Sequence, residues 1–166
     1  MRKNNSMLHF ICGKLGSGKT TLAKQIATET LAVFISEDIW LATLYPDEVN
    51  SLQDYLLYSK RIRKIIYNLA VELLTNNISV VFDFGGNTLQ DRAWVKSIIE
   101  QAGAKHVLHY IIASDELCKQ QFKKRNLDLP VGSKFITDEE FNTVNFYFSP
   151  PSENEGFIVQ QHQQIE

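Results

Sequence analysis

A glycine-rich stretch near the N-terminus, GKLGSGKT, has the residue types and spacing that bind phosphate groups. It fits the pattern G-x-x-x-x-G-K-[ST] at every position. Glycines let the backbone curl until several N–H groups point into one hollow; the lysine adds charge for the β- and γ-phosphates, and the threonine offers a hydroxyl to Mg²⁺. The stretch therefore predicts a site for ATP with Mg²⁺. The residues predicted to bind the nucleotide are Gly13, Lys14, Leu15, Gly16, Ser17, Gly18, Lys19, Thr20 and Thr21.

The residues on either side of this stretch favour a phosphate loop over an ordinary glycine-rich turn. Residues 7–12 form an apolar run that indicates a short buried strand, and residues 20–30 have the spacing of an amphipathic helix. A helix that starts at the loop points its free N–H groups and the positive end of its dipole at the phosphates.

Two acidic residues that follow predicted strands are placed to complete the chemistry. Asp83 ends the apolar run VVFD, and such an aspartate holds Mg²⁺ directly or through water; the alternative is a turn or helix cap. Asp38 follows the run 32–35, and we expect it to accept the proton of an attacking hydroxyl. Alternatively, Ser36 caps the next helix while Glu37 and Asp38 favour its dipole, and both roles are compatible.

Two arginines are candidates for stabilising the transferred phosphate. Arg125 ends a predicted helix that begins near Ser114, and we expect it to reach the triphosphate while the polar segment 125–137 acts as a lid. The alternative is a cationic helix end that interacts with the dipole. Arg92, shortly after Asp83, is predicted to contact an acceptor or a phosphate, with a surface salt bridge as the alternative.

A cationic run and a group of aromatic residues bear on the acceptor. The run KRIRK at 60–64 has its cations opposite an apolar stripe, so a solvated outer face is the favoured interpretation; cations along the cleft would favour a polynucleotide. Four aromatic side chains near the expected acceptor side either wall an acceptor pocket or pack as core and rim. They are Trp40, Tyr45, Tyr55 and Tyr58.

The elements that position these residues alternate between strand and helix along most of the chain. This alternation predicts an α/β fold, a parallel sheet with helices on both faces, whose ligands bind at the carboxyl ends of the strands. The run at 78–84 predicts a strand buried on both faces. Further strands are expected at 106–113 and 157–159, and further helices at 52–75, 89–102, 114–125 and from the capping box TDEE at 137–140. The buried stripe of the long helix is expected to contain Ile62, Ile65, Ile66, Leu69 and Leu73.

Length and composition exclude several classes of protein. With 166 residues, 44% hydrophobic and 22% charged, the chain suits one globular domain, 1–166. The net charge of −2 argues weakly against general nucleic-acid binding. The apolar stretches are too short for a membrane span or a signal peptide, and Cys12 and Cys118 lack metal-type or redox-type spacing, so we expect a cytoplasmic protein.

Several of these motifs together resemble those of small P-loop kinases of the AAA-type ATP-binding group. The resemblance lies in the phosphate loop, the SED sequence, VVFDFGGNT with its following arginine, and the helix ending FKKRN, over about residues 7–125. The group includes polynucleotide 5′-hydroxyl kinases, zeta-toxin-like and chloramphenicol-type phosphotransferases, and gluconate-kinase-like enzymes. The resemblance implies a five-stranded parallel sheet of order 2-3-1-4-5 in three layers, with a small lid. It also implies that Lys19 and Thr20 bind nucleotide and Mg²⁺, that Asp38 activates the acceptor, and that Arg125 is the lid arginine.

Three functions are compatible with this sequence. The favoured one is an ATP-dependent kinase acting on a hydroxyl of an unidentified small molecule. A polynucleotide 5′-hydroxyl kinase is less favoured. The polynucleotide kinases that this chain resembles carry an arginine two residues after the catalytic aspartate, and this chain has Trp40 at that position. The third is an ATP-binding switch protein without an acceptor. The sequence predicts no membrane partner and indicates no oligomeric state.

Overall fold

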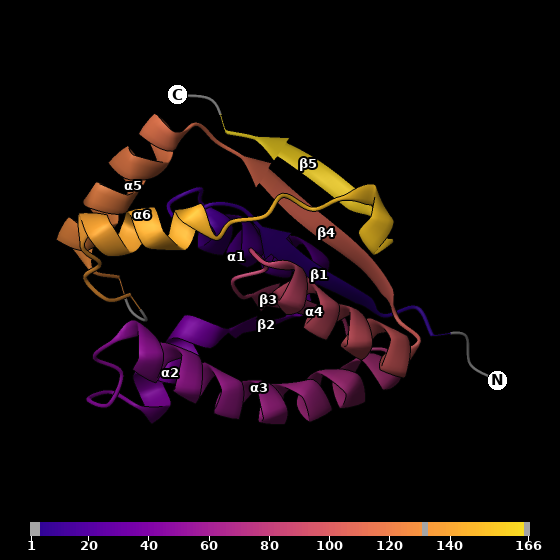
Figure 1. Cartoon of the computed structure of the whole chain (residues 1–166). Coiled ribbons are helices and arrows are strands. Elements are labelled where there is room, and N and C mark those ends of the chain that lie inside the picture. The colour runs from indigo at the N-terminus through magenta and orange to yellow at the C-terminus, as the bar shows by residue number, and fades with distance from the viewer. Residues whose placement is uncertain (1–3, 131–132, 165–166) are drawn as a thin grey trace.

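The computed structural model, which describes residues 4–130 and 133–164, contains a five-stranded parallel sheet (Figure 1). The order of its strands is β2-β3-β1-β4-β5, as predicted. The strands are β1 (Met7–Cys12), β2 (Val33–Ser36), β3 (Val80–Asp83), β4 (Lys105–Ile112) and β5 (Val159–Gln163). All four pairings are parallel, so the carboxyl ends of the strands share one edge of the sheet.

Helices cover both faces of the sheet, which completes the predicted three layers (Figure 1). They are α1 (Lys19–Thr30), α2 (Glu37–Leu44), α3 (Leu52–Thr75), α4 (Leu89–Ala102), α5 (Asp115–Asp128) and α6 (Asp138–Phe146), with a short 3₁₀ helix at Glu153–Glu155. α3 and α4 pack on one face and α1 packs on the other. No helix in the described part of the chain is long and apolar enough to cross a membrane.

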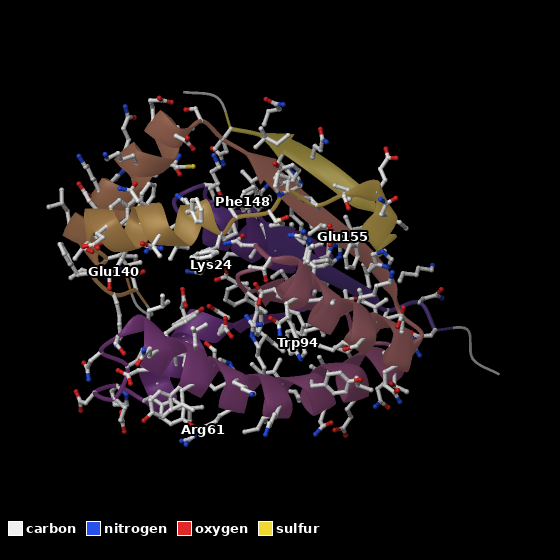
Figure 2. The ribbon with its side chains drawn as sticks, in the orientation of Figure 1. Lys24, Arg61, Trp94, Glu140, Phe148 and Glu155 are labelled. Carbon is white, nitrogen blue, oxygen red and sulfur yellow. The ribbon has the colours of Figure 1, made fainter. Side chains whose placement is uncertain are left out.

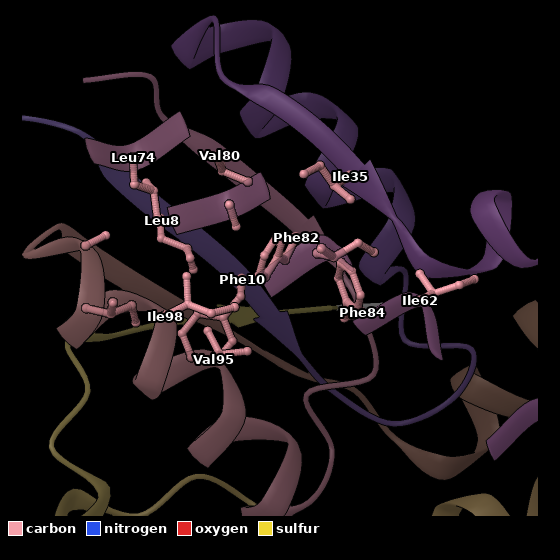
Figure 3. Packing of buried hydrophobic residues seen from close by; sticks show 14 of the residues in the cluster. Leu8, Phe10, Ile35, Ile62, Leu74, Val80, Phe82, Phe84, Val95 and Ile98 are labelled. Carbon is pink, nitrogen blue, oxygen red and sulfur yellow. The ribbon is translucent and has the colours of Figure 1, made fainter. Parts of the chain in front are cut away.

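The main core lies between the sheet and the pair α3 and α4 (Figure 3). Phe10 and Phe82 come from neighbouring central strands and are almost completely buried, and Ile62 and Val95 cover them from the two helices. A β-branched or aromatic strand without polar alternation is typical of a sheet covered on both faces. This core holds β1 and β3 rigidly, and both strands end at the loops that carry the candidate site.

Helix ends were better predicted than the buried stripe of α3. The structure confirms the bounds of α3 and α4 and the capping box of α6, in which the Thr137 hydroxyl accepts from the Glu140 N–H. The predicted stripe is wrong at Ile65, whose side chain is 60% exposed. Helical periodicity instead buries a row one position further round the helix. That row is Ser59, Ile62, Ile66, Ala70 and Leu74.

Two predicted segments near the C-terminus differ from the structure. The last strand lies at Val159–Gln163 and so begins two residues later than expected, because Val159 pairs with Leu108 of β4. α5 continues three residues past Arg125, so the first part of the predicted lid, 125–137, is helical. Residues 131 and 132 of that predicted lid lie outside the described residues.

Three histidines on neighbouring strands form a row across the sheet, on the face that carries α1. Nδ1 of His9 lies 3.0 Å from Nε2 of His109, and Nδ1 of His109 lies 3.0 Å from Nε2 of His162. Burial, followed by the charges of the two neighbouring rings, lowers the pKa of His109 to about 4. The row therefore links β1, β4 and β5 through a central imidazole, that of His109, which is uncharged near neutral pH.

Candidate functional site

The glycine-rich stretch joins the end of β1 to the start of α1, as a phosphate loop does. Gly16 and Gly18 have φ angles of 83° and 92°, a region that residues with a side chain rarely adopt. A Cβ atom on Gly16 would lie 2.2 Å from the carbonyl oxygen of Cys118. Both conformation and space therefore require glycine at this position.

A side chain from a distant part of the chain fixes the phosphate loop, while several N–H groups of the loop have no protein partner among the described residues. The Leu15 N–H donates to Oδ1 of Asn145 at 2.8 Å, and the Ser17 N–H donates to the Lys14 carbonyl at 3.1 Å. Among the described residues, no acceptor within hydrogen-bond distance faces the N–H groups of Gly16, Gly18 and the first residues of α1. Unpartnered N–H groups at the start of a helix fit the oxygens of a phosphate chain.

Lys19 lies over this hollow and is anchored by the loop itself. Its Nζ donates to the carbonyl oxygens of Gly13 at 2.7 Å and Lys14 at 2.9 Å. Burial lowers the pKa of Lys19 to about 8. A bound anion would oppose this effect, since a negative charge nearby favours the protonated amine.

Thr20 and Asp83 come together as the sequence predicts for a magnesium site. The Thr20 hydroxyl donates to both carboxylate oxygens of Asp83, at 3.0 and 3.2 Å. The Ser36 hydroxyl also donates to Asp83, at 3.0 Å. Ser36 occupies the N-cap position of α2, as the alternative interpretation had it, but its side chain makes no capping bond. Burial raises the pKa of Asp83, although the bonds from Thr20 and Ser36 oppose it.

These ligands suit a magnesium ion that is shared with a nucleotide. Within the described residues, no group of three or more His, Cys, Asp or Glu side chains is placed to hold a metal ion. Mg²⁺ accepts one or two protein oxygens and completes its octahedral shell with phosphate oxygens and water. Thr20 and Asp83 would supply those protein oxygens.

Asp38 lies in the first turn of α2, where β2 ends at the same edge of the sheet. The residue is exposed at the surface, although protein atoms crowd its carboxylate and reduce its hydration. This loss of hydration raises the pKa of Asp38 to about 6, and the charges of Glu37 and Asp83 add to the effect. Lys19 and Arg125 lower it, so Asp38 faces the cations that surround the phosphate loop.

Arg125 reaches this cleft from α5. Its Nε is buried and has no hydrogen-bond partner in the part of the chain that the structure describes. Burial lowers the pKa of Arg125 and the charge of Asp38 opposes this effect, so the two side chains lie near enough for their charges to interact. A buried guanidinium N–H without a partner is costly, and a phosphate oxygen would satisfy it.

Arg92, the fourth predicted catalytic residue, has a different environment. Its side chain is completely buried, and its guanidinium donates to Glu155 at 2.6 and 2.9 Å and to the carbonyl oxygens of Ser149 and Gly86. Because these partners occupy the guanidinium, Arg92 clamps the C-terminal segment to the loop after β3 and is not directed at a ligand. The sequence interpretation missed this because Glu155 is 63 positions away.

The cations of KRIRK do not share one face. Arg61 points outward from α3, with its guanidinium 5.3 Å from the Tyr58 ring centroid (Figure 2), and Lys60 and Lys64 are exposed. Arg63 instead turns inward and pairs with Glu37 at 2.7 Å and Asp91 at 2.6 Å. The solvated face is thus correct for three cations and wrong for Arg63. The available signal was that Arg63 stands next to Ile62 and one turn from the buried Ser59.

The aromatic residues near the acceptor side pack against the core, which is the alternative to an open pocket wall. Tyr45 and Tyr58 pack against each other at a tilt with ring centroids 4.2 Å apart, and both contact the main core. Tyr55 contributes a polar contact that the sequence analysis missed, because its hydroxyl donates to Oε2 of Glu37 at 3.0 Å. Trp40 also packs against this core.

Comparison with solved structures shows the same fold in several kinases. The chain resembles a candidate kinase from Chloroflexus aurantiacus with a TM-score of 0.78 and 14% identity, over 98% of this chain and 87% of that one. It resembles the APS kinase CysC of Mycobacterium tuberculosis, solved with AMPPNP and APS, with a TM-score of 0.63 and 16% identity, over 96% and 90%. It resembles a gluconokinase of Sinorhizobium meliloti 1021 with a TM-score of 0.58 and 16% identity, over 97% and 84%.

The phosphate loop, the strand order and these likenesses agree on a P-loop kinase fold. None of the curated proteins matches the chain in sequence. The sequence model of the AAA domain matches residues 8–151, which include the phosphate loop, Asp38, Asp83 and Arg125. The chain therefore belongs to the AAA domain family.

Proposed function

We propose that this protein is an ATP-dependent phosphotransferase that moves the γ-phosphate of ATP to a hydroxyl of a small molecule. The observation that most supports the proposal is that Asp38, Arg125 and Lys19 lie close enough together at the phosphate loop for their charges to act on one another. A carboxylate with a pKa near neutrality and a cation with an unpartnered N–H are the groups that a hydroxyl and a γ-phosphate need on opposite sides. The similarity of the fold to those of solved kinases also supports a phosphotransferase.

Each residue has a separate part in the transfer. The N–H groups of the phosphate loop and the Lys19 ammonium bind the β- and γ-phosphates, and Arg125 stabilises the charge on the transferred group. Mg²⁺, held by Thr20 and Asp83, would neutralise phosphate charge when bound. The acceptor oxygen forms a bond to the γ-phosphorus while the bond from that phosphorus to the β,γ-bridging oxygen breaks, so ADP leaves. The hydroxyl proton passes to the carboxylate of Asp38.

The test is transfer of labelled γ-phosphate from ATP to a panel of hydroxyl compounds by wild type and Asp38→Asn. We expect transfer to fall by about 10²–10⁴-fold in Asp38→Asn, because the base is lost. Binding of AMPPNP with Mg²⁺, measured by calorimetry, should be retained. Asp47→Asn, an exposed carboxylate in the loop after α2, is the matched control and should transfer at the wild-type rate.

The outcomes separate the proposal from its rivals. Undiminished transfer in Asp38→Asn would remove Asp38 as the base. Tight AMPPNP binding without transfer to any compound would favour the ATP-binding switch. Transfer to a 5′-hydroxyl oligonucleotide at low salt, where backbone binding is strongest, would favour the polynucleotide kinase.

A further inference from the structure

Beside the candidate base lies a charge network, here called the acceptor-side network, made of Glu37, Arg63 and Asp91. Glu37 is only 1% exposed, and both its oxygens are used. Oε1 accepts from Nε of Arg63 at 2.7 Å, and Oε2 accepts from the Tyr55 hydroxyl at 3.0 Å and from Nη2 of Arg63 at 3.3 Å. A buried carboxylate with three such bonds is held in one position.

Arg63 is neutralised from two sides. Besides the two bonds to Glu37, its Nη1 donates to Oδ1 of Asp91 at 2.6 Å, and the other oxygen of Asp91 accepts from the Thr88 hydroxyl at 2.7 Å. The guanidinium also lies 5.2 Å from the ring centroid of Trp94, which lies between α4 and α3 (Figure 2). These contacts fix Arg63 in place, so that it cannot turn freely to meet an incoming anion.

The network lies at the strand ends, next to the loop that follows β3. A cavity of about 10 Å³ is bounded there by Arg63, Asp91, Gly85 and Gly86 and by the apolar side chains of Phe84 and Trp94. Glu37 is the residue before Asp38 and shares its helix turn. Tyr55, whose hydroxyl donates to Glu37, lies near enough to Asp38 for the charge of Asp38 to act on it, so an acceptor whose hydroxyl reaches Asp38 would lie near this network.

The charges on this side do not balance. Two carboxylates, those of Glu37 and Asp91, pair with one guanidinium, that of Arg63, which leaves an excess of negative charge. The cations that act on Asp38, Lys19 and Arg125, are those of the phosphate side. A carboxylate or phosphate on the acceptor would meet this excess of negative charge beside a guanidinium whose charge is already paired, and such placements disfavour binding.

We infer that the acceptor is a hydroxyl compound without acidic groups, uncharged or amine-bearing, and that the acceptor-side network excludes anionic acceptors. This inference rests on the proposed function, because it concerns the acceptor of that transfer. Of the five N–H donors of Arg63, three make the bonds described, and the others can donate to acceptor hydroxyls. The carboxylate of Asp91 can accept from a hydroxyl or an ammonium group.

The first experiment tests charge exclusion without any acceptor. Protein loaded with AMPPNP and Mg²⁺ is titrated with inorganic sulfate in a calorimeter, so that the phosphate loop is already filled. We expect no saturable binding of sulfate to wild type. Asp91→Asn, which keeps the size and a hydrogen-bonding oxygen but removes one charge on Arg63, should bind sulfate at least about tenfold more tightly. The added change Arg63→Met should abolish that gain.

Two results of this titration would overturn the inference. One is saturable sulfate binding to loaded wild-type protein that Arg63→Met removes, since Arg63 would then be free for anions. The other is that Asp91→Asn folds, as judged by its circular dichroism and AMPPNP affinity, and still gains no sulfate binding. If Asp91→Asn does not fold, Glu37→Gln takes its place, with the same expected gain.

The second experiment uses acceptors that differ only in charge. Labelled transfer is measured with glucose, glucosamine and gluconate, and with a 5′-hydroxyl oligonucleotide. Product with the neutral or the amine-bearing sugar supports the inference, and product with gluconate or the oligonucleotide overturns it. Absence of product with every compound counts against the proposed transfer alone, because the sulfate titration still decides whether the network rejects anions.

Discussion

Asp38 and Lys19 have pKa values on either side of neutrality, and the proposed activity needs Asp38 deprotonated and Lys19 protonated. Asp38 acts as a base only when ionised, and its pKa is raised to about 6, so activity should rise with pH through that value. Lys19 binds phosphate best when protonated, and its pKa is lowered to about 8, so activity should fall above that value. We expect a bell-shaped profile of kcat/KM for ATP, which reports these free-enzyme groups.

The alkaline limb of this profile has a direct control. Lys19→Arg keeps the positive charge at all accessible pH values, because a guanidinium does not lose its proton there. The variant should therefore lose the fall above pH 8 even if its activity is lower throughout. An unchanged alkaline limb in Lys19→Arg would assign that limb to another group.

Individual residues were predictable where the chemistry is local. Lys19, Thr20 and Asp38 belong to short motifs, and the structure brings them to one edge together with Asp83. Arg92 was not predictable, because its partners are supplied by a distant turn whose position no local pattern records. The inward position of Arg63 was not predictable for a related reason. A helical wheel shows which face of α3 is apolar, but it does not show that the carboxylates of Glu37 and Asp91 lie at the edge of that face.

At the scale of an element, the shape of the phosphate loop depends on its glycines. In Gly16→Ala the new Cβ would meet the Cys118 carbonyl at 2.2 Å, so the loop must shift. We expect AMPPNP binding weakened by about tenfold or more, since charge-assisted hydrogen bonds to phosphate would be misaligned. Calorimetric titration with AMPPNP and Mg²⁺ measures this.

Gly103→Ala is the matched control for that variant. Gly103 also has a positive φ, 60°, at the end of α4, but a Cβ there would meet no atom within 4 Å. This change should cost about 1–2 kcal/mol of stability from backbone strain alone and leave nucleotide affinity unchanged. Equal effects of the two variants on affinity would show that the close contact with α5 is unimportant.

The histidine row makes the edge of the sheet sensitive to acid. The pKa of His109 is about 4 in the folded protein against an ordinary 6.5, so the unfolded chain binds a proton more readily. Stability should therefore be unaffected at pH 7 and above and fall as pH drops below 6.5. The loss should level off below about pH 4, at roughly 3 kcal/mol. Urea unfolding between pH 4 and 7 measures it.

His109→Gln should flatten this dependence, because glutamine does not titrate. Wild type and variant should differ in the slope of stability against pH, whatever their difference at pH 7. Parallel slopes between pH 4 and 6.5 would place the acid sensitivity elsewhere.

Whole elements were predicted well where the signal is periodic and capped. The bounds of α3 and α4 agree with the structure because a capping residue marks the start of each helix and a residue of low helix propensity follows its end. β5 was placed too early because its own residues, VQQHQ, are mostly polar and exposed. Only pairing with β4 makes this segment a strand, and pairing is not a property of the local sequence.

For the molecule as a whole, the clamp between Arg92 and Glu155 joins two halves of the chain. Arg92→Met removes one partner of a buried pair and should cost about 3–5 kcal/mol in urea unfolding. Arg92→Met with Glu155→Leu should recover part of that loss, because no unpaired carboxylate remains near the buried site. Unchanged stability of Arg92→Met together with lost phosphate transfer would instead support the catalytic role expected from the sequence.

The contact between Arg92 and Glu155 also affects the order in which parts of the protein can finish folding during synthesis. Synthesis delivers the phosphate loop, Asp38 and Asp83 early, but the carboxylate that neutralises Arg92 is added only at position 155. Until then a guanidinium destined for complete burial has no ionic partner, and water must remain around it. The loop after β3, which Arg92 joins to the C-terminal segment, therefore reaches its final surroundings only when the turn at Glu153–Glu155 has been made.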